Sequence, residues 1–342
     1  MSGGLHPREM IKGLLQGIAP TRPLFLPIVF SLGAKVENLS LQSYLANPTK
    51  ISNALRQIRG YLRADGVCCY FDPYLELDAL GANLQWGAAG EAPQISWQGG
   101  SKRGELPGGL RSVEDAAKAP RVTVAVEVIR RLKTILRNEP LLMAGVTGPL
   151  TLASQLTGCR GESESAVGDL NSDAIELSAA ILGSFARTFA EAGTNVVFIQ
   201  EEVAPAASDE SYEHWASLLE PVFNVVRFYE ALPVLLLTES FVSGANLALM
   251  FRRNWNCVVC LPVKEYVAAI AGGARTNSAV GMGIALPSGQ FSGQALTALD
   301  AFGSVGEAVK ALRPAIVTTT GDVPLSSDPK LIMQAFHEIV PH

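Results

Sequence analysis

Acidic residues stand at or just after the ends of several apolar segments of this chain. They are Asp72, Glu201, Glu202, Glu239 and Asp322. Asp72, for example, directly follows the run GVCCYF at 66–71. Burying a carboxylate costs free energy unless a bound partner or a functional role compensates. Carboxylates that share one pocket also raise each other's pKa. The pattern therefore indicates proton transfer, metal binding or recognition of a cation. The alternative is that some of these acids, above all Glu202 and Asp322, stabilise the N-termini of following helices.

Eight short, apolar segments rich in β-branched residues must position these acids. The predicted strands cover residues 24–31, 66–72, 141–146, 195–201, 234–239, 257–261, 279–285 and 315–320. Several are apolar at nearly every position, as expected for parallel strands that are covered on both faces.

Longer segments with apolar residues at helical spacing alternate with the strands. The predicted helices cover residues 41–63, 122–137, 173–192, 211–229, 245–253, 293–299, 305–312 and 329–339. This alternation predicts an α/β fold, a (β/α)8 TIM barrel that forms a single domain over residues 1–342. A doubly wound open sheet is the alternative. In a barrel the active site lies at the C-terminal ends of the strands, where the acids stand.

Two segments interrupt the alternation. Residues 83–100 (NLQWGAAGEAPQISWQGG) predict a β-hairpin excursion after the second strand, and residues 158–172 predict a polar, exposed loop.

Composition limits the partners and the compartment. Hydrophobic residues make up 48% of the 342 and charged residues 17%, and the net charge is −5. We expect a small-molecule substrate and no nucleic acid, since phosphate binding needs clustered Lys and Arg. Neither a secretory signal nor a membrane span is recognisable, so we expect a cytoplasmic protein without membrane contact. A homodimer is compatible with the sequence.

The five cysteines predict reduced thiols, not a disulfide framework. Cys257 and Cys260 have the spacing of a redox motif, but they lie inside a predicted strand, where residues three apart face opposite sides. We expect them, with Cys68 and Cys69, to be core residues.

Four segments occur in the order and spacing of a known family. They are YFDPYL at 70–75 with ALG at 79–81, GVTGPLTLAS at 145–154, AG at 192–193 before the acid pair, and GDVP at 321–324 with DP at 328–329. From about Arg8 to the last helix, the chain resembles the uroporphyrinogen decarboxylase superfamily. The resemblance implies a (β/α)8 barrel. The superfamily contains porphyrinogen decarboxylases and zinc-dependent, corrinoid-linked methyltransferases.

The chain departs from the decarboxylases. Their first strand ends in Arg-Gln-Ala-Gly-Arg, whereas residues 27–35 here are PIVFSLGAK, without an arginine. A substrate ringed by carboxylates needs cationic anchors, which arginine supplies as a bidentate fork. The resemblance also places Gln155 at the family's tyrosine, Glu202 at its serine and Gly321 near its histidine. Of that set only Asp72 remains.

The chain also departs from the methyltransferases. Their zinc ligands, His-x-Cys at strand 5 and a further Cys after strand 8, correspond to Leu237, Glu239 and Gly321 or Asp322 here. The set of thiolate and imidazole ligands that zinc prefers is therefore missing. Any divalent metal would need carboxylates, with Glu201, Glu239 and Asp322 as candidates. Methyl transfer from a methoxy or methylamino compound remains open.

The sequence therefore predicts a methyltransferase or demethylase that acts on a small substrate, with a corrinoid protein as acceptor. The alternatives are a decarboxylase or other lyase and a non-catalytic ligand-binding barrel. Asp72, Glu201 and Glu239 are the predicted catalytic residues. The predicted substrate-binding residues are Glu202, Gln155, Ser31 and Asp322.

Overall fold

The computed structural model describes residues 5–87, 92–137, 139–159, 170–245, 247–271, 281–288, 312–328 and 332. The predicted helix 293–299, the predicted helices 305–312 and 329–339 except Leu312 and Ile332, and most of the loop at 158–172 lie outside the described residues.

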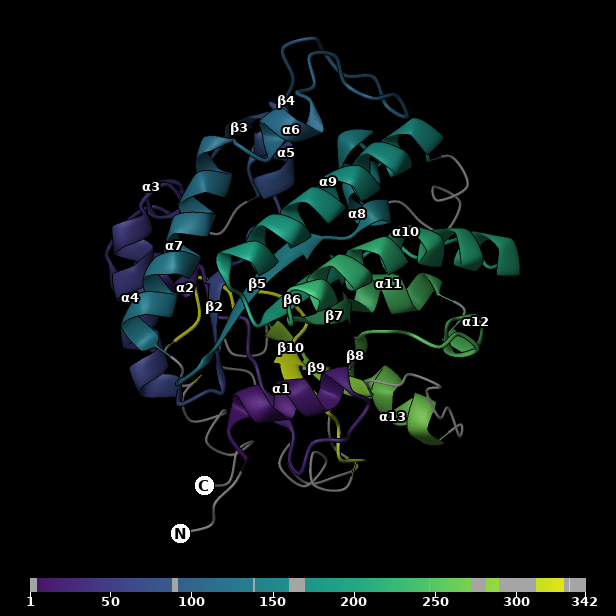
Figure 1. Cartoon of the computed structure of the whole chain (residues 1–342). Helices are drawn as coiled ribbons and strands as arrows, with labels where there is room; N and C mark the ends of the chain where they lie inside the picture. The colour runs from purple at the N-terminus through teal and green to yellow at the C-terminus, as the bar shows by residue number, and fades with distance from the viewer. Residues whose placement is uncertain are drawn as a thin grey trace.

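Eight parallel strands form one sheet that curls into a nearly closed barrel inside a layer of helices (Figure 1). The strands run in the order β1–β10–β9–β8–β7–β6–β5–β2. They are β1 (Leu24–Phe25), β2 (Gly66–Tyr70), β5 (Leu141–Thr147), β6 (Val196–Glu201), β7 (Leu232–Leu237), β8 (Val258–Pro262), β9 (Met282–Leu286) and β10 (Ile316–Thr319). Each lies within or overlaps one predicted segment, so the prediction of a (β/α)8 barrel is confirmed.

Asp65 connects the two strands at the ends of this order, β1 and β2. Its backbone N–H donates to the Phe25 carbonyl at 3.0 Å, and its carboxylate accepts from the Phe25 N–H at 2.8 Å. Arg22 holds the same carboxylate at 2.6 Å. An acid thus bridges the barrel where the strand ladder is interrupted.

Helices cover the outside of the barrel. They are α1 (Pro7–Leu15), α2 (Leu32–Val36), α3 (Leu41–Leu45), α4 (Pro48–Leu62), α5 (Leu75–Leu80), α6 (Val113–Ala116), α7 (Pro120–Leu136), α8 (Pro149–Leu156), α9 (Ser172–Ala192), α10 (Asp209–Phe228), α11 (Glu239–Gly244), α12 (Leu247–Phe251) and α13 (Val263–Ala271). None of the helices in the described part of the chain combines the length and the apolar character needed to cross a membrane.

The single helix predicted over residues 41–63 is wrong. α3 ends at Leu45, and Asn47 caps the start of α4, where its side chain accepts a hydrogen bond from the Lys50 N–H at 3.1 Å. Pro48 then occupies the first position of α4, where its missing N–H costs nothing.

The predicted hairpin excursion is confirmed. Strands β3 (Asn83–Gln85) and β4 (Gln94–Ser96) pair in antiparallel register after β2 and α5.

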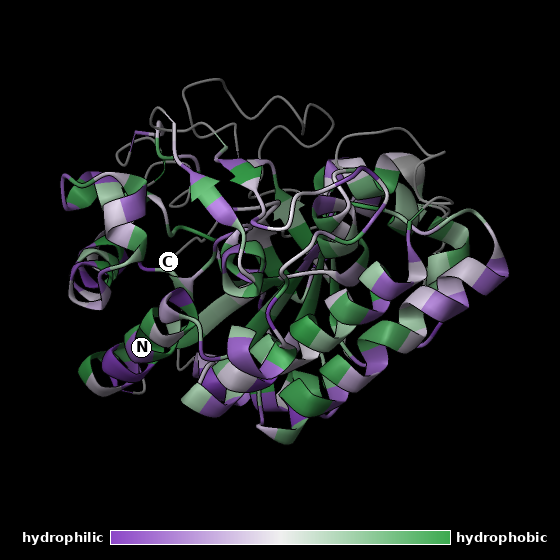
Figure 2. Cartoon of the chain, turned by 90° about the horizontal axis from the view of Figure 1, so that it is seen from above, coloured by the Kyte–Doolittle hydropathy of each residue, from purple (hydrophilic) through white to green (hydrophobic). Residues whose placement is uncertain are grey.

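The core lies between the strands and the helices. All positions of β2, β5, β7, β8 and β9 are buried, and Figure 2 shows hydrophobic strands inside helices that mix both characters. Cys68, Cys69, Cys257 and Cys260 are free thiols buried in this core. Burial raises the pKa of the Cys69 thiol to about 12, so the reactive thiolate is disfavoured.

Candidate functional site

Two adjacent residues of β6 face opposite sides of the barrel wall. Gln200 faces the interior, where its side-chain nitrogen donates to the carbonyl of Thr320 on the far strand at 3.3 Å. Glu201 faces the helices and is completely buried. Successive side chains of a strand alternate between its two faces, so the strand-end acid cannot share the interior with Gln200.

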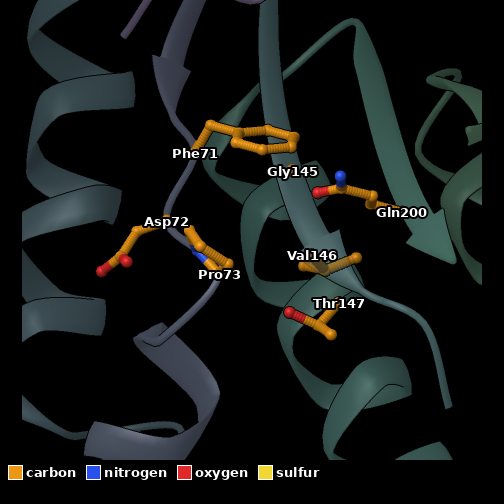
Figure 3. Close-up of a pocket in the computed structure, with 7 residues that line it drawn as sticks. All are labelled: Phe71, Asp72, Pro73, Gly145, Val146, Thr147 and Gln200. Atoms are coloured by element: carbon orange, nitrogen blue, oxygen red, sulfur yellow. The ribbon is translucent and has the colours of Figure 1, made fainter. Parts of the chain in front are cut away.

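A cleft opens at the C-terminal ends of β2, β5 and β6 (Figure 3). Its empty volume is about 170 Å³, including the part that is open to solvent. The lining residues are Phe71, Asp72, Pro73, Gly145, Val146, Thr147 and Gln200. A cleft at this end of a barrel is where the active sites of such folds lie.

Two glycines of the segment 145–148 (GVTG) shape this region. A Cβ atom on Gly145 would lie 2.2 Å from the ring of Phe71, and one on Gly148 would lie 2.6 Å from a carboxylate oxygen of Glu201. Gly145 therefore lets the aromatic ring lie across β5, and Gly148 makes room for the acid of β6.

The carboxylate of Glu201 holds the N-terminus of α8. It accepts hydrogen bonds from the backbone N–H of Thr151 at 2.7 Å and of Leu150 at 3.3 Å, and from the Thr151 hydroxyl. The indole N–H of Trp215 on α10 adds a further bond. Burial raises the pKa of Glu201 to about 7, while these donors partly offset the shift.

Asp72 is bound to an arginine that the sequence analysis did not identify. Its carboxylate forms an ion pair with Arg121 at the start of α7, and its other oxygen accepts from the Tyr74 N–H at 3.1 Å. Figure 3 shows this carboxylate pointing away from Thr147 and Gln200. Arg121 also lies over the ring of Trp86, 5.8 Å from its centroid.

A second buried acid, Glu76 on α5, also escaped the sequence analysis. One of its oxygens accepts from the Thr147 N–H at 2.9 Å and the other from the Thr147 hydroxyl at 3.0 Å. Glu76 is 1% exposed, and burial raises its pKa. It therefore fixes the position of Thr147, which lines the cleft.

Asp322 and Ser31 connect the exits of β10 and β1. The carboxylate of Asp322 accepts from the N–H groups of Phe30 at 2.7 Å and Ser31 at 2.8 Å, just before α2. The Ser31 hydroxyl donates to the Val323 carbonyl at 3.3 Å. Burial raises the pKa of Asp322 to about 6. Asp322 therefore satisfies two backbone N–H groups of the segment that leads from β1 into α2.

The remaining predicted site residues lie apart from the cleft lining. Glu239 is exposed in the first turn of α11, which Thr238 caps. Glu202 is partly exposed, and its backbone N–H donates to the Thr151 hydroxyl at 2.7 Å. Gln155 on α8 is 6% exposed, and its amide has no hydrogen-bond partner in the described part of the chain.

The expectation that these acids converge in one pocket is wrong. Glu201 binds the α8 N-terminus, Asp322 binds the β1 exit, and Asp72 binds Arg121. The individual roles stay predictions, both the catalytic ones and the substrate-binding ones: Asp72, Glu201, Glu239, Glu202, Gln155, Ser31 and Asp322.

The three carboxylates considered for a metal, those of Glu201, Glu239 and Asp322, do not form one ligand set. Among the described residues there is no group of three or more His, Cys, Asp or Glu side chains that could hold a metal ion. The described residues therefore do not fit a carboxylate metal site there.

Comparison with known proteins gives one family. A model of the family described as uroporphyrinogen decarboxylase (URO-D) matches residues 7–236. A methyltransferase from Methanosarcina mazei has a similar structure, with a TM-score of 0.72 and 14% identity over 98% of each chain. A GH113 β-1,4-mannanase reaches a TM-score of 0.38 at 10% identity, over 86% of this chain and 94% of that chain, too low to carry an argument. No curated protein matches the chain.

Proposed function

Because the chain belongs to the uroporphyrinogen decarboxylase (URO-D) family, we propose that it is an enzyme of methyl transfer. In this proposal it takes a methyl group from a small substrate and passes it to a corrinoid carried by a separate protein. The solved methyltransferase from Methanosarcina mazei, which covers 98% of this chain, supports the choice within the family.

The observation that carries the proposal is the chemistry of the cleft between β2, β5 and β6. The described lining residues include one aromatic ring, one hydroxyl and one amide, and the charged residue among them is Asp72, which is paired with Arg121. A porphyrinogen ringed by carboxylates would need several cationic groups. A small substrate without negative charge fits this lining better.

The proposed reaction balances as follows. The bond between the methyl carbon and its nitrogen or oxygen breaks, and the electron pair stays on that heteroatom, which takes up a proton from solvent. A reduced corrinoid, carried by the separate protein, would supply the electron pair that accepts the methyl group. The chain's own contribution is to bind and orient the substrate, with Phe71, Thr147 and Gln200 as the lining groups.

The experiment is a transfer assay with a reduced corrinoid, free and bound to a corrinoid protein. A panel of small methoxy and methylamino compounds is offered, and loss of the reduced corrinoid's absorbance is followed. We expect turnover with at least one compound. Gln200→Leu should lower the rate by about tenfold or more, since a buried polar partner is lost. Glu127→Gln, on the exposed side of α7, is the control and should leave the rate unchanged.

Two outcomes would contradict the proposal. Release of carbon dioxide from uroporphyrinogen, without any methyl transfer, would favour the decarboxylase. Tight binding of a small ligand with no turnover of any compound would favour a non-catalytic barrel.

A further inference from the structure

We infer that the cleft selects a small ligand that donates hydrogen bonds through N–H, because two of its described lining residues, Thr147 and Gln200, each hold an acceptor oxygen whose direction is fixed by a neighbouring group. The inference rests on the proposed function for the methyl group of the ligand, but its binding preference can be tested without turnover. Small N-methylated amides and amines that keep at least one N–H are the class it predicts.

Gln200 presents its carbonyl oxygen to the cleft. Its side-chain nitrogen lies 3.3 Å from the carbonyl oxygen of Thr320, which can only accept a hydrogen bond. The amide group cannot be reversed without placing two acceptors together. Figure 3 shows the side-chain oxygen of Gln200 pointing toward the strands that carry Phe71 and Gly145.

The Thr147 hydroxyl can only accept a hydrogen bond from a ligand. Its hydroxyl donates its one proton to Glu76 at 3.0 Å, and the second oxygen of Glu76 already accepts from the Thr147 N–H at 2.9 Å. A hydroxyl whose proton is committed offers only its lone pairs to a ligand. Glu76 therefore sets the direction of the hydrogen bond that Thr147 can make in the cleft.

The cleft is not suited to a cation that binds through its charge alone. Asp72 is paired with Arg121, and its carboxylate points away from Thr147 and Gln200. A quaternary ammonium ion, which has no N–H, would find neither an unbalanced carboxylate nor a use for the two acceptors among the described lining residues. The ring of Phe71 offers an apolar wall against which a methyl group can pack.

The first experiment compares matched ligands by calorimetry at neutral pH. N-Methylacetamide is paired with N,N-dimethylacetamide, and methylammonium with tetramethylammonium, so that each pair differs in its N–H donors. We expect the donor of each pair to bind about tenfold tighter or more, because a buried acceptor left without a partner is costly. The two pairs also distinguish an amide ligand from an ammonium ligand.

The second experiment reverses the direction of the hydrogen bond between the Thr147 hydroxyl and residue 76. In Glu76→Gln the new amide nitrogen can donate to the Thr147 oxygen, which turns the hydroxyl proton toward the cleft. The preference for N-methylacetamide over N,N-dimethylacetamide should then fall by about tenfold. Thr147→Val, which keeps the side-chain shape and removes the acceptor, provides a second route if Glu76→Gln does not fold, and should also reduce the preference. Glu127→Gln should not change it.

The outcomes separate this inference from the proposed function. Equal affinity within both ligand pairs, or an unchanged preference in a folded Thr147→Val variant, would overturn the inference. Efficient methyl transfer from compounds without N–H would also overturn it while leaving methyl transfer intact. Selective binding of the N–H donors without any transfer would support the inference and refute the proposed function.

Discussion

The indole nitrogen of Trp215 donates a 3.1 Å hydrogen bond to the carboxylate of Glu201, in the layer between the barrel and its helices. Trp215 is 1% exposed and Glu201 is 0% exposed. Because the same carboxylate binds the N–H of Thr151 at 2.7 Å, one acid connects β6, α8 and α10. The geometry therefore favours a structural role for Glu201 over the catalytic role that the sequence predicts.

Replacing Glu201 should destabilise the fold. In Glu201→Gln one acceptor oxygen becomes an NH2 group that faces other donors, so we expect a loss of about 1–3 kcal/mol in the free energy of unfolding. Chemical denaturation measures it. Glu191→Gln, on the exposed side of α9, is the control and should change stability by less than about 0.5 kcal/mol. Unchanged stability together with abolished turnover would restore the catalytic role.

The pH dependence of stability should carry the signature of Glu201. Its pKa in the folded state is about 7, above its ordinary value of 4.5, so the folded state binds the proton more tightly than the unfolded state. The contribution of Glu201 to the free energy of unfolding is therefore largest below about pH 4.5. It falls as the pH rises toward 7 and is constant above pH 7. The slope of the free energy of unfolding against pH between 5 and 7 should become more positive in Glu201→Gln. An identical slope in both proteins would contradict the shifted pKa.

The pair of Asp72 and Arg121 should show strong coupling. Its side chains are 4% and 13% exposed, so removing one partner leaves a charge that is mostly buried. We expect Asp72→Asn and Arg121→Gln each to cost about 3 kcal/mol, and the double variant to cost much less than their sum. Denaturant unfolding of the four proteins gives the coupling energy. Additive losses would show that the ion pair does not form in solution.

The sequence predicts the barrel well but the site poorly, and Gln200 and Glu201 show why. Each strand is a clear run of apolar residues, so the sequence predicts that the strand exists. Which of two successive residues faces the interior depends on the position of the strand within the barrel. In a strand that is covered on both faces, the residues on both faces are apolar. The sequence therefore does not show which residues face the interior. Because neighbouring residues of β6 face opposite sides, Gln200 lines the cleft and Glu201 faces the helices, whereas the sequence analysis expected the acid at the site.

Arg121 was missed for a different reason. It stands 49 residues after its partner, beyond the hairpin excursion, and no local spacing connects it to Asp72. Asn47 and Pro48, by contrast, are a readable helix boundary, because a capping residue followed by proline begins a helix.

The two glycines beside the cleft should not tolerate alanine. Gly145→Ala would place a Cβ atom 2.2 Å from the ring of Phe71, and Gly148→Ala one 2.6 Å from Glu201. We expect losses of about 1–3 kcal/mol from overpacking in thermal or chemical unfolding. Phe71→Leu should recover part of the loss in Gly145→Ala and none in Gly148→Ala.

Gly183→Ala inside α9, where nothing lies within 4 Å of the new atom, is the control and should stabilise the protein. Full stability of Gly145→Ala would mean that Phe71 lies elsewhere.

Asp322 should stabilise the exit of β1 more than it serves catalysis. Its carboxylate binds the N–H groups of Phe30 and Ser31 at 2.7 and 2.8 Å, from the opposite end of the chain. In Asp322→Asn one of these two donors loses its acceptor, since the new NH2 group cannot accept. Amide hydrogen exchange should therefore accelerate by about tenfold or more at whichever of Phe30 and Ser31 loses its acceptor, while exchange in β6 stays unchanged.

The same variant tests the raised pKa of Asp322. Its folded-state pKa of about 6 lies above its ordinary value of 3.8, so the contribution of Asp322 to stability declines as the pH rises from about 4 to 6 and is constant above that range. Asp322→Asn should remove this decline, and Asp209→Asn at the exposed start of α10 should not. If exchange at Phe30 and Ser31 is unaffected while ligand binding is lost, the carboxylate acts on the substrate, and the substrate-binding role predicted from the sequence would replace the structural one.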